Sequence, residues 1–146
     1  MTKANDELAL KLFVVLSRAH NAVIHEVEKD IRGYGVNPTE FAVLELLYHK
    51  GSQPLQKIGE KILISSGSIT YVVDKLEKKQ LLVRLPCPKD RRITYATLTD
   101  EGTSWMNERF DDHKKRIASI LSGLNDEETE QTIALLKKLG LHALQA

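Results

Sequence analysis

The chain has 146 residues, of which 42% are hydrophobic and 28% are charged. These values are typical of one globular domain and exclude general disorder. The formal net charge is only +1, but it is unevenly distributed. Residues 1–53 carry six basic and seven acidic groups, residues 54–92 nine and four, and residues 93–146 six and nine. A basic middle between acidic ends predicts one surface that meets an anionic partner.

Several classes of protein are excluded or disfavoured. No apolar run approaches the roughly 18 residues of a membrane span, and the start lacks a signal-peptide core, so we expect a cytoplasmic protein without membrane contacts. Cys87 is the single cysteine, which excludes an internal disulfide framework. His20 and His25 lack the i,i+4 spacing of a metal pair. No local nucleotide-binding, metalloprotease or nucleophile motif occurs, so we expect no metal, no cofactor and no enzymatic activity.

The N-terminal part predicts three helices. Apolar residues recur at helical spacing from about Asp6 to Ile31, without proline or glycine. The segment Asn37–Glu40 then predicts an N-cap, a proline at the first helical position and a capping-box carboxylate. This second helix is expected to end at Gly51. Pro54 is expected to open a short third helix.

The middle of the chain predicts a helix-turn-helix followed by a wing. The second helix of the motif is expected to begin at Ser65–Ser68 and to reach Lys79. Residues Leu81–Leu85 and Ile93–Leu98 are rich in strand-forming side chains. Between them lies a turn-rich basic segment, which indicates a β-hairpin with a charged tip.

The C-terminal part predicts two further helices. Thr99 is expected to cap a long helix that reaches Gly123, and Asn125 is expected to cap the last helix. The expected fold class is therefore mainly α with a small β-hairpin wing, a winged helix-turn-helix with N- and C-terminal dimerisation helices. We expect a single domain, residues 1–146, with a DNA-binding lobe at 37–98 and dimerisation helices at 1–34 and 99–146.

Hydroxyl and amine side chains follow the start of the predicted recognition helix. Backbone N–H groups at a helix N-terminus can bind phosphate oxygens, and hydroxyls can bind phosphates or base edges. The candidate DNA-binding residues on this helix are Ser65, Ser66, Ser68, Thr70, Tyr71, Lys75 and Lys78. The alternative is a serine-capped surface helix with solvated lysines.

The tip of the predicted wing carries Lys89, Asp90, Arg91 and Arg92. An arginine at such a tip can enter a narrow minor groove, where the potential is most negative. Asp90 is expected to hold an arginine in one rotamer by a forked carboxylate–guanidinium contact. The alternative is a solvated turn in which Asp90 only forms the turn.

The chain resembles the MarR family of winged helix-turn-helix regulators over nearly its full length. The resemblance is carried by Asp90–Gly102, similar to a wing pattern of D-x-R followed by L-T-x-x-G, and by Ser68–Glu77, similar to the recognition helix. It implies that Arg92 enters the minor groove, that Asp90 orients it, and that the helix from Ser65 lies in the major groove. It also implies a homodimer, often a repressor, that releases DNA when a small phenolic compound or an oxidant acts on it.

The sequence departs from the family pattern at two positions. Tyr71 stands where the family often has arginine, so a DNA contact is lost there or replaced by a phenol hydroxyl. Gln80 stands where a glycine commonly ends the recognition helix. Because left-handed glutamine would cost on the order of 1 kcal/mol, a different cap is expected.

The terminal helices carry more apolar surface than a small winged helix can cover, which predicts a symmetric interface with a second copy. The candidate interface residues are Leu8, Leu12, Leu136, Leu139 and Leu141. The alternative is that these leucines close a monomeric core.

The regulatory signal has two candidate sites. An effector pocket between the dimerisation helices and the DNA-binding lobe is implied by the resemblance. Its candidate lining residues are Phe13, His20, Tyr34, Phe41 and Tyr48, although aromatics at such spacings are more often core. Cys87 is a candidate redox residue, because nearby cations favour a reactive thiolate; the alternative is an inert strand cysteine.

These observations predict a homodimeric DNA-binding regulator, a repressor released from a pseudo-palindromic double-stranded operator by a small phenolic or quinone-type effector or an oxidant. Two other classes stay open. One is a protein-interaction adaptor that uses its winged helix without binding DNA, and the other is a small enzyme.

Overall fold

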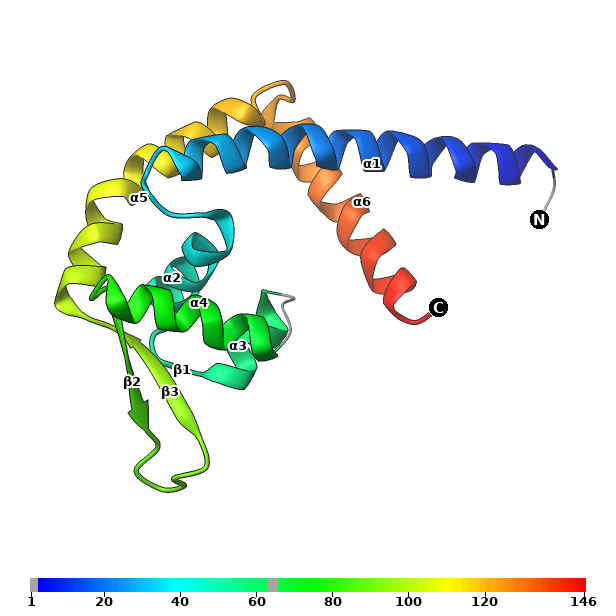
Figure 1. Ribbon diagram of the computed structural model, residues 1–146. Coiled ribbons are helices and arrows are strands. Elements are labelled where there is room, and N and C mark those ends of the chain that lie inside the picture. The colour runs from blue at the N-terminus through cyan, green and yellow to red at the C-terminus, as the bar shows by residue number, and fades with distance from the viewer. Residues whose placement is uncertain (1–2, 63–65) are drawn as a thin grey trace.

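The computed structural model describes residues 3–62 and 66–146, which form six helices and three strands (Figure 1). The helices are α1 (Lys3–Arg32), α2 (Pro38–Lys50), α3 (Leu55–Lys61), α4 (Ser66–Lys78), α5 (Asp100–Ile120) and α6 (Asp126–Leu144). The strands are β1 (Gln53–Pro54), β2 (Leu82–Pro86) and β3 (Thr94–Leu98). The predicted fold class, mainly α with a small β wing, is confirmed.

Helix α2 begins as the sequence predicts. The Asn37 side chain accepts a hydrogen bond from the Glu40 backbone N–H, and the Glu40 carboxylate accepts one from the Asn37 N–H. The same reciprocal box starts α6, between Asn125 and Glu128. Gly51 ends α2 with a φ of 77°, in the left-handed region that glycine adopts without a steric cost.

Pro54 precedes α3 as its N-cap, as predicted, but it also belongs to a strand that the sequence did not predict. Pro54 lies in β1, where it pairs with Tyr95 of β3, and the helix begins at Leu55. The sheet therefore has three antiparallel strands in the order β1-β3-β2. A strand of two residues has no alternation that a sequence pattern could reveal. Proline is tolerated in it because an edge strand can lack a donor N–H.

Helix α4 ends with the left-handed glutamine that the sequence argued against. Gln80 has a φ of 65°. The Leu81 N–H donates to the Leu76 carbonyl over 3.1 Å and the Gln80 N–H to the Glu77 carbonyl over 2.9 Å, which is the Schellman ending. The expectation of a different cap is therefore wrong. The Thr99 hydroxyl donates to the Gln80 carbonyl over 2.6 Å, and this contact, together with the buried Leu81, offsets the backbone cost of about 1 kcal/mol.

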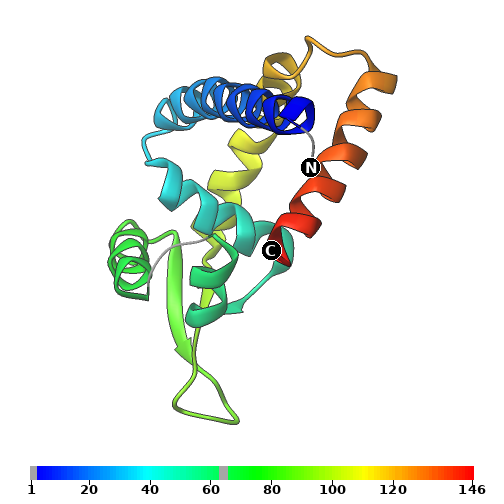
Figure 2. The same cartoon turned by 90° about the vertical axis from the view of Figure 1, so that its right-hand side faces the viewer.

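The main core lies between α2, α3, α4, α5 and the sheet. Its fully buried large side chains are Val43, Leu44, Ile58, Val73, Leu76, Leu82 and Met106. Helix α1 lies beside α5, and its N-terminal end extends past the rest of the molecule (Figure 1). In that view α6 stands away from the lobe formed by α2–α4 and the sheet. Figure 2 looks almost along α1 from its N-terminal end and shows the wing at the opposite end of the molecule from α1. The lobe is thus joined to the rest of the protein through the C-terminal half of α1 and through α5.

Candidate nucleic-acid interface

Helix α4 has one face in the core and the other in solvent. Ile69, Val72, Val73 and Leu76 are buried, at the spacing of one helical face. The predicted DNA-binding residues Ser68, Thr70, Tyr71 and Lys78 are exposed, and Lys75 is half-buried. Ser66 is the first residue of α4, and Ser65 lies outside the described residues. Ser68, Thr70, Tyr71, Lys75 and Lys78 therefore share the solvent side of one helix.

An ion-pair cluster joins α4 to the wing. The Arg84 guanidinium of β2 lies 2.6 Å from the Asp74 carboxylate and 2.9 Å from that of Glu77. The Arg84 backbone N–H also donates to Glu77 over 3.1 Å. These hydrogen bonds hold the pKa of Glu77 below its usual value. Sequence analysis missed the cluster because its members come from two elements whose relative position a linear pattern does not show.

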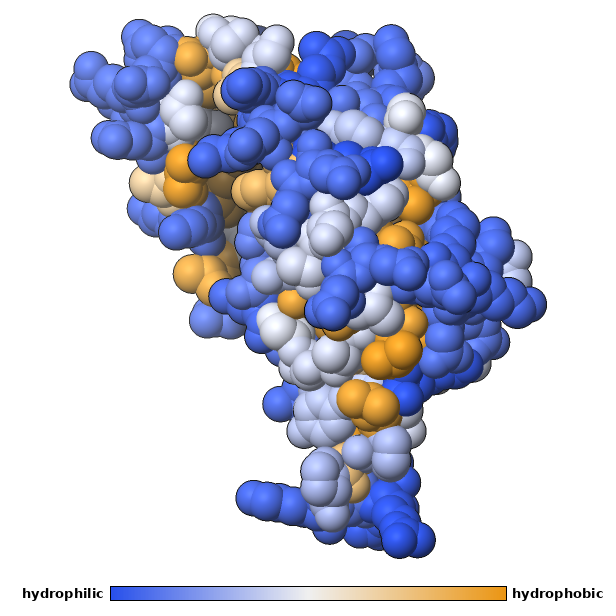
Figure 3. All heavy atoms as spheres, turned by 90° about the vertical axis from the view of Figure 1, so that its left-hand side faces the viewer, coloured by the Kyte–Doolittle hydropathy of each residue, from blue (hydrophilic) through white to orange (hydrophobic). Residues whose placement is uncertain are grey.

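The wing projects from the body, and its tip is hydrophilic (Figure 3). Lys89, Arg91 and Arg92 are exposed there. Arg92 donates to the Asp90 carboxylate from Nε over 3.1 Å, from Nη2 over 3.2 Å and from its backbone N–H over 3.0 Å. These bonds lower the pKa of Asp90. The forked contact expected from the sequence is present, although the Arg92 side chain remains 91% exposed.

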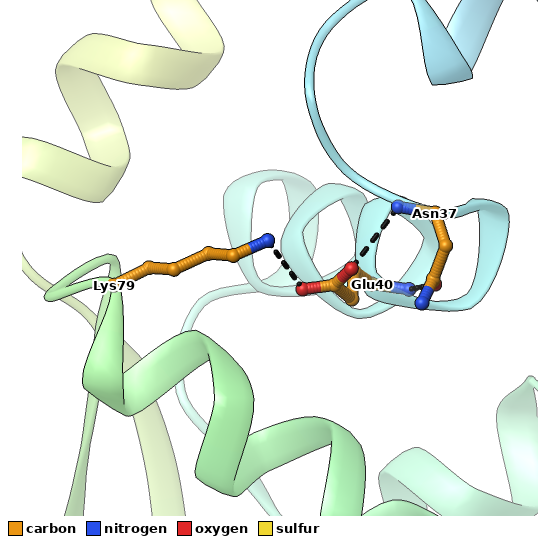
Figure 4. Close-up of polar contacts among 3 residues, drawn as sticks. All are labelled: Asn37, Glu40 and Lys79. Atoms are coloured by element: carbon orange, nitrogen blue, oxygen red, sulfur yellow. Dashed lines mark hydrogen bonds and ion pairs between the residues drawn. The ribbon is translucent and has the colours of Figure 1, made fainter.

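The C-terminal end of α4 is tied to the start of α2. The Lys79 ammonium lies 2.9 Å from the carboxylate of Glu40, the same carboxylate that caps α2 through Asn37 (Figure 4). Burial raises the pKa of Glu40, but the Asn37 N–H and Lys79 together bring the pKa below its usual value. Lys79 therefore points toward α2, although its side chain remains 41% exposed.

The base of the wing explains the L-T-x-x-G part of the motif. The Thr99 hydroxyl accepts from the Gly102 N–H over 2.9 Å and its backbone N–H donates to the Leu81 carbonyl over 3.1 Å. A Cβ on residue 102 would overlap that carbonyl oxygen. Glycine is needed here because the first turn of α5 passes directly over the chain that leaves α4.

The five aromatic residues predicted to line an effector pocket are not gathered in one place. Phe13 and His20 are exposed on α1. At 1.5 Å per residue they lie roughly 30 Å and 20 Å along the helix axis from Tyr34. Tyr34 and Phe41 pack together, with ring centroids 5.9 Å apart. Tyr48 packs on Phe110 instead, at 5.7 Å, and its hydroxyl donates to Asn107. The structure therefore brings together only Tyr34 and Phe41, as part of the packing.

A buried histidine that sequence analysis did not single out lies where α1, α2 and α5 meet. The Nδ1 atom of His113 lies 3.1 Å from the Asp30 carboxylate, and Nε2 lies 3.6 Å from that of Glu45. The ring packs against that of Phe41 in a tilted arrangement, with the centroids 4.6 Å apart. The Tyr34 hydroxyl donates to Asp30 over 2.9 Å, and burial with this hydrogen bond raises the pKa of Tyr34. The position of His113, seven residues after the buried Met106, was the available signal.

Cys87 is half-buried at the wing. Its backbone N–H donates to the Ile93 carbonyl over 2.8 Å, and the Ile93 N–H donates to the Asp90 carbonyl over 3.0 Å. The backbone of this candidate redox residue therefore takes part in the hydrogen bonds that join the two sides of the wing tip.

The proposed interface leucines are all solvent-exposed in the single chain. They are Leu8, Leu12, Leu136, Leu139 and Leu141. None of residues 126–144 of α6, all of which the structure describes, is buried. An apolar groove of about 480 Å³ lies between the end of α5 and α6, lined by side chains that include Ile120, Leu124, Ile133 and Leu136. In the single chain these leucines do not close a core.

Within 3–62 and 66–146, no helix combines the length and apolarity needed to span a bilayer. The same residues contain no group of three or more histidine, cysteine or acidic side chains placed to hold a metal ion.

The chain is similar to known proteins over nearly its whole length. The sequence pattern of the MarR family matches residues 36–94. The HTH-type transcriptional regulator MhqR of Bacillus subtilis is 55% identical over 139 residues, or 95% of this chain and 96% of MhqR. The HTH-type transcriptional repressor MdtR of the same species is 31% identical, over 94% and 88% of the two chains. The structure of Bordetella bronchiseptica BpsR, whose DNA binding is regulated by 6-hydroxynicotinic acid, matches with a TM-score of 0.78 and 25% identity over 89% of this chain and 98% of BpsR.

Proposed function

Because the chain belongs to the MarR family of transcriptional regulators, we propose that it is a homodimeric repressor of a pseudo-palindromic double-stranded DNA operator. A small phenolic or quinone-type effector, or an oxidant, releases it. The observation that carries the proposal is the fork between Asp90 and Arg92 at the tip of the wing. It orients an exposed guanidinium without burying it, which serves a partner outside the chain and contributes little to stability.

Each lobe makes two kinds of DNA contact in this proposal. The solvent side of α4 enters the major groove, where Ser68, Thr70 and Lys78 meet phosphates and base edges. Arg92 enters the adjacent minor groove, while Lys89 and Arg91 contact the flanking phosphates. The net positive charge of residues 54–92 favours both contacts.

The homodimer is supported by the surfaces of α1 and α6. A helix of 19 residues without a buried side chain gains little from its own chain, since most helical stability in proteins comes from packing. Its leucines, with those of α1, fit a symmetric interface between two copies. The two recognition helices would then meet half-sites about one DNA turn apart, roughly 10 bp centre to centre.

The effector is proposed to act where α1, α2 and α5 meet. The tilted ring contact between His113 and Phe41 and the Tyr34–Asp30 hydrogen bond connect the DNA-binding lobe to the long helices there. A planar phenol can compete with both the ring contact and the hydroxyl contact. Regulation of BpsR by 6-hydroxynicotinic acid supports an aromatic effector of this size. A coupling of about 1–3 kcal/mol between effector and DNA would change affinity by 5- to 150-fold.

Footprinting on DNA next to its own gene tests the proposal. We expect a protected pseudo-palindrome that is lost when a phenol, quinone or peroxide is added, and affinity that falls steeply with salt as counterions are released. Cys87→Ser, tested in parallel, separates ligand binding from thiol oxidation. If the thiol takes part, this variant should no longer be released by peroxide but should still be released by the phenol or quinone. No footprint on any adjacent DNA would instead favour the adaptor that binds a protein partner.

A further inference from the structure

Tyr71 stands out on the solvent side of α4. Its side chain is 62% exposed, although the helix already buries a complete apolar face with Ile69, Val72, Val73 and Leu76. The ring therefore adds nothing to the core, and the core leaves it available for a contact outside the chain. It lies in the N-terminal half of the helix, the part that faces base edges in helix-turn-helix proteins.

The ring of Tyr71 is held by Lys75, one turn further along α4. The Lys75 ammonium lies 5.2 Å from the ring centroid, within the range of a cation–π contact. The neighbouring Asp74 carboxylate is paired with Arg84 at 2.6 Å, so its charge is balanced where it would otherwise repel phosphates. The result is an apolar ring with restricted motion on a surface that is otherwise polar.

We propose that Tyr71 is a specificity-determining residue that reads one thymine in each half-site, with its ring packed against the C5-methyl group. The inference rests on the proposed function of α4 as the recognition helix. The thymine methyl is the apolar feature that the base pairs present in the major groove, and an exposed ring is complementary to it. Lys75 acts as a positioning residue that keeps the ring oriented toward the bases.

Selection from randomised duplex DNA, followed by substitution of thymine by deoxyuridine, tests this assignment. The wild-type protein should enrich a half-site with a thymine whose replacement by uracil weakens binding about fourfold, the effect of removing one buried methyl group. Tyr71→Phe keeps the ring and should keep this ratio. Tyr71→Ala should bind thymine and uracil sites equally. Lys75→Gln should give an intermediate ratio, because the ring loses its fixed orientation.

The outcomes distinguish this inference from the function on which it rests. If the wild-type protein enriches no sequence, the proposed DNA-binding function fails. If it enriches a site but Tyr71→Ala keeps the thymine-to-uracil ratio, only the role of Tyr71 is overturned. Loss of that ratio in Tyr71→Phe would also overturn it, since the hydroxyl and not the ring would then carry the discrimination. Because Tyr71 is exposed, circular dichroism should show the Tyr71→Ala fold unchanged.

Discussion

Asp90 and Arg92 are joined at the wing tip by two parallel contacts, Oδ1 to Nε at 3.1 Å and Oδ2 to Nη2 at 3.2 Å. Asp90 therefore fixes the orientation of the Arg92 guanidinium, although its own negative charge would oppose DNA binding.

This relationship predicts an unusual pair of effects. Arg92→Ala should weaken operator binding by about tenfold or more, within the cost of losing one specific DNA contact, with little change in stability. Asp90→Ala should also weaken binding, although it removes a negative charge. In the Arg92→Ala background the same change should leave affinity unchanged or raise it. Fluorescence anisotropy on the footprinted site measures all four proteins. Lys114→Ala, a change in an exposed cation on α5, is the control; equal losses from it and from Arg92→Ala would remove the wing from the mechanism.

Replacing Gln80 should stabilise the protein. Gln80→Gly relieves the left-handed backbone at φ 65° and should raise the free energy of unfolding by about 1 kcal/mol. Urea denaturation at one fixed protein concentration measures the change, because the stability of the proposed dimer would depend on concentration. Gln80→Ala retains a Cβ, so its free energy of unfolding should stay close to that of the wild type. A stabilisation by alanine as large as that by glycine would contradict the explanation.

Gly102→Ala should be strongly destabilising. The added methyl group meets the Leu81 carbonyl oxygen, so either α5 or the end of α4 must move, at a cost of about 2–4 kcal/mol. Thermal unfolding measures the loss. Gly123→Ala is the matched control, since nothing lies within 4 Å of a Cβ at that position. Similar melting temperatures for both variants would show that the wing base is not tightly packed.

Glu40 should make stability depend on pH. Its folded-state pKa is lowered, so its contribution is present above the ordinary carboxyl value of about 4.3 and is lost as pH falls through the lower folded value. Glu40→Gln should destabilise the protein by about 1–2 kcal/mol at pH 7, because the amide oxygen can still accept the Asn37 N–H but the ion pair with the partly exposed Lys79 is lost. The difference from wild type should shrink below about pH 4.3. A pH-independent difference between pH 7 and pH 3 would exclude a role for the ionised carboxylate.

Charge placed on α6 should separate the two copies. Leu136→Asp buries a carboxylate in the proposed interface and should convert the dimer to monomer in sedimentation experiments. Glu130→Asp on the same helix keeps the surface charge and serves as control. If wild type sediments as a monomer, the leucines have another partner.

Much of the fold could be predicted from local sequence patterns. The Asn37 and Asn125 caps, the helical spacing of α4 and the Asp90–Arg92 fork all involve residues within a few positions of one another. What the sequence did not reveal depends on tertiary contacts. Gln80 adopts a left-handed backbone because Thr99, 19 residues later, binds its carbonyl.

The residues that join distant elements were likewise missed. His113 meets Asp30 across 83 residues, and a lone histidine gives no sign of such a partner. The five predicted aromatic residues do not all lie together in the single chain. Residue type alone does not show which side chains pack together.

The ion pairs of Arg84 should influence which DNA sequences fit the recognition helix and the wing at the same time. Because Arg84 of β2 forms ion pairs with Asp74 and Glu77 of α4, the recognition helix and the wing are linked directly to each other. In the proposed DNA complex, each lobe would place α4 in a major groove and Arg92 in the minor groove beside it, so both contacts would form only where the two grooves have the matching phase. Base pairs between these two contacts are touched by neither element, yet their local twist decides whether both fit at once. Operator preference should therefore extend to positions that no side chain reaches.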